Sequence, residues 1–81
     1  MHEHTAAVKR ILAMKQGDYY GVLGLDERNV TRAKVEMAFE TLYPLTDPKM
    51  NKTAGAGKAH DIVRSAYYKL REKHRFRELN W

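Results

Sequence analysis

The chain has 81 residues, of which 43% are apolar and 31% are charged, so it is one small domain and too apolar for a disordered tail. It has no cysteine, which excludes disulfides, thiolate zinc sites and cysteine nucleophiles. The net charge is +5, and most of it falls in residues 58–81, which hold seven basic and three acidic side chains. Such a basic segment permits contact with phosphates, acidic lipids or an acidic protein face.

The first predicted helix has Thr5 as its N-cap and Gly17 at its C′ position. Its buried side is predicted to carry Ala7, Val8, Ile11 and Leu12. A short helix follows from Tyr19 to about Leu23, capped by Asp18 and closed by Gly24.

The third predicted helix begins after Thr31, a good N-cap. Its apolar residues recur at i, i+3, i+4 and i+7, which places one buried stripe on it: Val35, Ala38, Phe39 and Leu42. Pro44 has no backbone N–H and biases Tyr43 away from helix, so we expect this helix to end near Tyr43.

Residues 44–57 are predicted to form a loop, and the last long helix to begin near Gly57 or Lys58. The core stripe of that helix is Ala59, Val63, Ala66, Tyr67 and Leu70. Residues 72–81 are expected to hold one or two more helical turns, with Phe76 and Leu79 folding back.

No segment has apolar and polar residues alternating with period two, so the fold class is predicted to be all-α. The contact between the two long helices should be formed by Phe39, Leu42, Val63, Ala66, Tyr67 and Leu70.

Three segments carry a family resemblance. Residues 18–25 read Asp-Tyr-Tyr-Gly-Val-Leu-Gly-Leu, followed by Ala38-Phe39 with Leu42, and then by Val63 with Ala66-Tyr67 and Leu70. In order and spacing these segments resemble the J domain of DnaJ-type co-chaperones. The resemblance implies a small helical fold in which an antiparallel pair of long helices is flanked by short ones. Residues 18–81 would form this J-like domain as one compact unit, and residues 1–17 would add a leading helix.

The chain departs from the family at the residues that activate a DnaK-type chaperone ATPase. Active J domains carry a His-Pro-Asp tripeptide after their second helix, and the ungapped alignment places Asp47, Pro48 and Lys49 there. The family's Asp accepts hydrogen bonds from a chaperone arginine, whereas Lys49 has no acceptor and carries like charge. No histidine occurs between His4 and His60 that a slip of the loop could supply.

The second-helix face of active J domains is rich in Lys and Arg and docks on an acidic chaperone surface. The matching positions here are Glu36, Met37, Glu40 and Thr41, so acids replace bases. This reversal removes the charge complementarity that guides the encounter. The resemblance therefore implies a degenerate J-like domain rather than an active co-chaperone.

Another surface is predicted on the last helix, where Arg64, Tyr68, Arg71 and Arg75 fall on one face that Glu72 interrupts. Arginine and tyrosine are enriched at protein interfaces, and they also contact phosphates and stack on bases. A solvated helix face explains the same pattern without any partner.

We therefore expect a non-enzymatic J-like interaction or regulatory domain that does not stimulate a DnaK-type ATPase. The expected partner is another protein, such as a J protein or a subunit of a larger complex. The alternatives are a small basic helical module that binds nucleic acid and a divergent but active co-chaperone. No nucleophile–base pair or metal-ligand cluster is apparent, so neither a cofactor nor a metal is expected.

The expected location is intracellular, cytosolic or nuclear, because no apolar run could span a membrane and no signal peptide opens the chain. No membrane contact is expected from this chain, although a longer parent protein could supply a membrane anchor.

Overall fold

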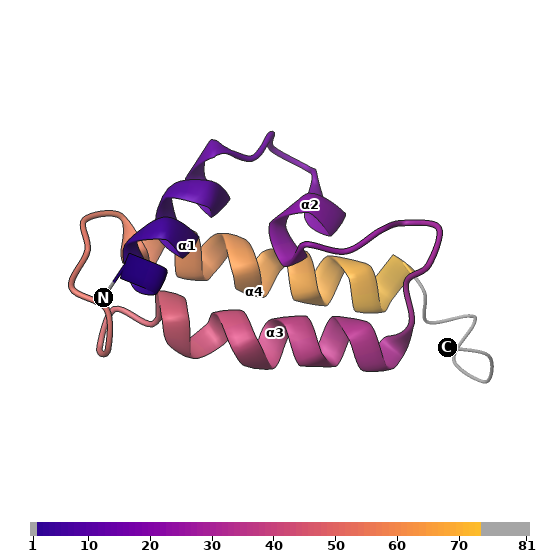
Figure 1. Ribbon diagram of the computed structural model, residues 1–81. Helices are drawn as coiled ribbons and strands as arrows, with labels where there is room; N and C mark the ends of the chain where they lie inside the picture. Colours follow the sequence, from indigo (N-terminus) through magenta and orange to yellow (C-terminus); the bar gives the residue numbers. More distant parts are fainter. Residues whose placement is uncertain (1, 74–81) are drawn as a thin grey trace.

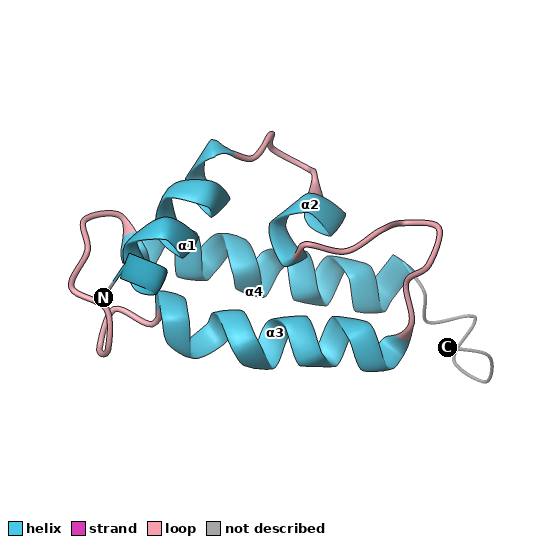
Figure 2. Ribbon diagram, in the orientation of Figure 1, coloured by secondary structure: helices cyan, strands magenta, loops and turns pink. Residues whose placement is uncertain are grey.

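The computed structural model describes residues 2–73, with side chains from Thr5 onward. Four helices and no strand occur in that range, which confirms the predicted all-α class (Figures 1 and 2). The helices are α1 (His2–Ala13), α2 (Tyr19–Leu23), α3 (Arg32–Thr46) and α4 (Ala56–Lys73). Between residues 2 and 73, no helix combines the length and the apolar character needed to cross a membrane. The turns expected around Phe76 and Leu79 fall outside the described residues.

The long helices α3 and α4 run antiparallel and side by side (Figure 1). Five of the six residues predicted at their contact are buried: Leu42, Val63, Ala66, Tyr67 and Leu70. Phe39 differs, because it is only half-buried. Its ring lies at the edge of the contact and stacks on Tyr67, with centroids 4.0 Å apart and planes 14° from parallel.

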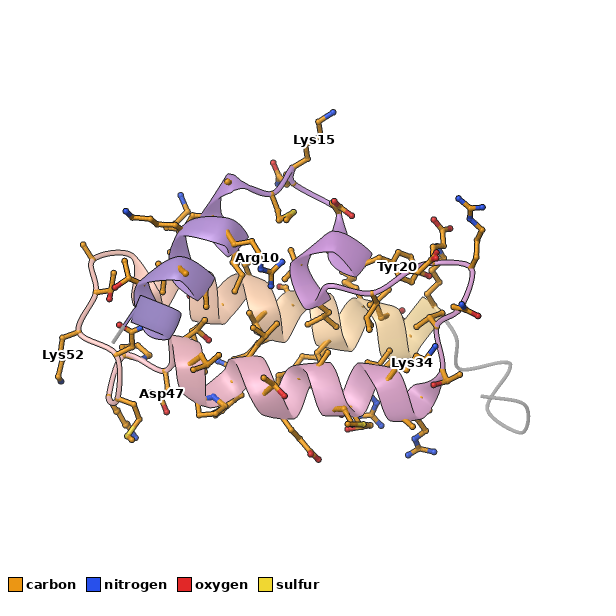
Figure 3. The ribbon with its side chains drawn as sticks, in the orientation of Figure 1. Arg10, Lys15, Tyr20, Lys34, Asp47 and Lys52 are labelled. Carbon is orange, nitrogen blue, oxygen red and sulfur yellow. The ribbon has the colours of Figure 1, made fainter. Side chains whose placement is uncertain are left out.

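The helices α1 and α2 both lie on one side of the α3–α4 pair (Figure 1). Val8 and Ile11 of α1 and Val22 and Leu23 of α2 are buried in the core shared with the pair. The leading helix thus belongs to the same core as the rest of the chain. Arg10 joins it to α2: its guanidinium points toward α2 (Figure 3) and donates to the carbonyl oxygens of Gly21 and Val22, each at 2.8 Å.

The ends of α2 are confirmed, and those of α1 differ from the prediction. The Asp18 side chain accepts from the N–H of Gly21 at 3.0 Å, and Gly24 closes α2 at φ 71°. Thr5 is not the N-cap of α1, because nothing in residues 2–4 breaks a helix and the helix already includes His2. Gly17 does not cap α1 either: the helix ends at Ala13, and Gly17 lies in the turn beyond it.

The third helix begins as predicted, with the Thr31 hydroxyl accepting from the N–H of Lys34 at 3.2 Å. Its predicted end near Tyr43 is wrong, since α3 continues through Pro44 to Thr46. Pro44 lies in the last turn of α3, where it removes one hydrogen bond to the Glu40 carbonyl and its ring crowds that carbonyl. The extra turn is held by Thr46, which is fully buried and whose hydroxyl donates to the carbonyl of Leu42 at 2.9 Å.

The loop between α3 and α4 is shorter than predicted, because α4 begins at Ala56. Gly55 precedes it with φ 88°, a conformation that side chains rarely adopt. A Cβ at this position would also lie 2.8 Å from Leu12 Cδ1 of α1. Glycine therefore lets α1 pack closely against the start of α4.

Replacing Leu70 by Ala should lower the free energy of unfolding by about 2–5 kcal/mol, because its side chain is fully buried and leaves a cavity between the helices. Leu12→Ala is the matched control: Leu12 is 38% exposed, and its loss should cost about 1 kcal/mol. Chemical denaturation monitored by circular dichroism gives both values. Equal losses would contradict the placement of α4 described above.

Candidate interaction surface

The side of the α3–α4 pair that faces away from α1 and α2 carries no other described helix (Figure 2). Both helices present side chains there, and we call this surface the open face. It is formed by Phe39, Glu40, Tyr43, Arg64, Tyr68 and Arg71. The α3 residues of this face are at least 21 positions from the α4 residues in the sequence, and the packing of the two helices brings them together.

A continuous series of aromatic contacts runs along the seam between α3 and α4. The Tyr43 ring lies edge-on to both Phe39 and His60, at 5.2 Å and 4.4 Å between centroids. Phe39 stacks on Tyr67, and Tyr67 lies edge-on to Tyr68 at 5.4 Å. Edge-on and offset aromatic pairs add to the energy of simple burial. They also fix the ring orientations that the open face presents.

The basic stripe predicted on α4 borders this seam. Arg64, Tyr68 and Arg71 are exposed, and Tyr68 is 55% exposed. The Arg71 guanidinium carbon lies 5.5 Å from the centroid of the Tyr67 ring, within the range of a cation–π contact. Arg64 has no hydrogen bond or ion pair with another residue in the range 2–73. Arg75, the fourth predicted member, lies outside the described residues.

On α3, the structure corrects the expectation that Glu36 belongs to a free acidic surface. Glu36 is half-buried, and the Tyr67 hydroxyl donates to its carboxylate, with 2.9 Å to Oε1 and 2.8 Å to Oε2. Burial, and then the hydrogen bond and charge of Glu36, raise the pKa of the Tyr67 hydroxyl above its ordinary value of 10.0. On α3, Glu40 stays exposed, with Met37 and Thr41 exposed beside it. On α4, the exposed acids Asp61 and Glu72 line the same surface hollow as Arg64 and Tyr68.

A second polar contact joins α3 and α4 at the other end of the helix pair. His60, expected to pack or to lie at the surface, is buried, and its Nδ1 lies 3.1 Å from the Thr46 hydroxyl oxygen. That hydroxyl gives its hydrogen to Leu42, so it can accept from the Nδ1–H of His60. The sequence carried no signal for this pair, because Thr46 was expected in a loop.

The residues that align with the J-domain tripeptide lie directly after α3. Asp47 is the C-cap of the helix, and its carboxylate accepts from the N–H of Lys49 at 3.0 Å (Figure 3). Pro48 and Lys49 are exposed. The following turn is fixed by Asn51, which is buried, donates to the Leu45 carbonyl at 2.7 Å and accepts from the N–H of Thr53 at 2.8 Å.

Within residues 2–73 there is no group of three or more His, Asp or Glu side chains that could hold a metal ion. The described surface instead combines exposed arginines, exposed aromatic rings and the exposed acids Glu40, Asp61 and Glu72. Exposed arginines and aromatic rings are residue types that are enriched at protein interfaces.

Comparisons of the chain with protein-family models, with curated proteins and with solved structures found no match in any of the three.

Replacing Tyr67 by Phe removes the hydrogen bond to Glu36 and should cost about 1–2 kcal/mol of stability at neutral pH. The pKa of Tyr67 is raised in the folded state, so this contribution is complete below pH 10 and is lost as the pH rises through the folded-state pKa. Denaturation at pH 7 and at increasing pH above 10 should therefore show the two proteins converging. Tyr68→Phe is the control and should match the wild type at pH 7, since its hydroxyl makes no described hydrogen bond. A constant difference between the wild type and Tyr67→Phe at all pH values would contradict the assigned contact.

Proposed function

We propose that this chain is a J-like domain that binds other proteins and does not stimulate a DnaK-type chaperone ATPase. The observation that carries the proposal is the segment Asp47–Lys49, which follows α3 at the place where active J domains have His-Pro-Asp. It is a binding domain and not an enzyme in this proposal.

The order of the helices supports the family resemblance. The segment that resembles the opening of a J domain forms α2, with its Asp and Gly as the two caps. The other two similar segments lie on α3 and α4, where Leu42, Ala66 and Leu70 meet in the core. Each of the three segments therefore lies on a helix, in the order that the resemblance implies, and supplies either the caps of that helix or residues of the core.

The charges and hydrogen-bonding groups of Asp47 and Lys49 are unsuited to stimulating a DnaK-type ATPase. The family's Asp accepts hydrogen bonds from an arginine, whereas Lys49 is a pure donor and is exposed. Asp47 replaces the family's His, and its carboxylate is already bonded to the backbone of Lys49. A like-charge contact that is desolvated on binding costs several kcal/mol.

The second-helix face adds to this effect. Where the family places bases, Glu36 is bonded to Tyr67 and Glu40 is exposed with the opposite charge. Encounter with an acidic chaperone surface would be slowed rather than steered. Binding is therefore assigned to the open face, where Arg64, Tyr68 and Arg71 are exposed.

The full chain should not stimulate the single-turnover ATPase of a DnaK-type chaperone, with a genuine J domain as the positive control. The variant with Asp47→His and Lys49→Asp restores the tripeptide, and it should recover little activity because Glu36 and Glu40 remain. Circular dichroism checks that both proteins are folded. Stimulation by the wild type within a few-fold of the control would contradict the proposal.

A protein partner captured with the full chain should depend on the open face. The double variant Tyr68→Ala with Arg71→Ala should weaken its binding by about thirty-fold or more, equivalent to about 2 kcal/mol, because exposed Tyr and Arg residues act as interface anchors. Lys15→Ala with Lys58→Ala is the control, since both lysines are exposed and line a different hollow, which includes none of Arg64, Tyr68 and Arg71. Isothermal titration with the purified partner measures both. Loss of binding in the control alone would place the interface elsewhere.

A further inference from the structure

We draw no further inference here: the strongest candidate, the apolar cleft between the end of α1, the start of α2 and Ile62 of α4, has two lysines and two aspartates at its rim, and nothing in the described residues shows what covers it.

Discussion

The structure depends on the register in which α3 and α4 pack against each other. Two polar contacts fix that register, one between Glu36 and Tyr67 and the other between Thr46 and His60. The aromatic rings of Phe39 and Tyr43 fill the distance between them. Apolar burial alone would tolerate a shift of one helix along the other more easily, because it is not directional. Hydrogen bonds to half-buried and buried groups do not tolerate it, since a shift would leave their partners unpaired.

This register also decides what each side of the helix pair can do. The side with Val63, Ala66 and Leu70 is filled by α1 and α2, and Arg10 holds those two helices together. The opposite side keeps its rings and charges at the surface. The acid Glu36 is bonded to Tyr67, whereas Glu40 on α3 and the arginines and acids of α4 stay exposed. The proposal that this side binds other proteins follows from this division.

The helices and most of the core could be predicted from the sequence, because apolar spacing and capping residues act locally. Asp18, Gly24 and Thr31 cap helices as predicted, and Leu42, Val63 and Leu70 are buried.

The errors in the prediction have non-local causes. The extra turn of α3 after Pro44 is held by burial of Thr46 and by its contact with His60, which is 14 positions away. Glu36 was predicted to be exposed because its partner, Tyr67, lies 31 positions later in the chain and no local pattern connects the two. The stripe of Arg64, Tyr68 and Arg71 was visible in the sequence, whereas its position beside Phe39 and Tyr43 depends on the register of the pair.

The register is tested most directly by an aromatic nuclear Overhauser spectrum of the full chain. Cross-peaks are expected between the rings of Phe39 and Tyr67, whose centroids are 4.0 Å apart, and between those of Tyr43 and His60, whose centroids are 4.4 Å apart. Absence of both cross-peaks, or contacts of Tyr43 with Tyr67 in their place, would mean that α3 and α4 pack in another register and would contradict the account.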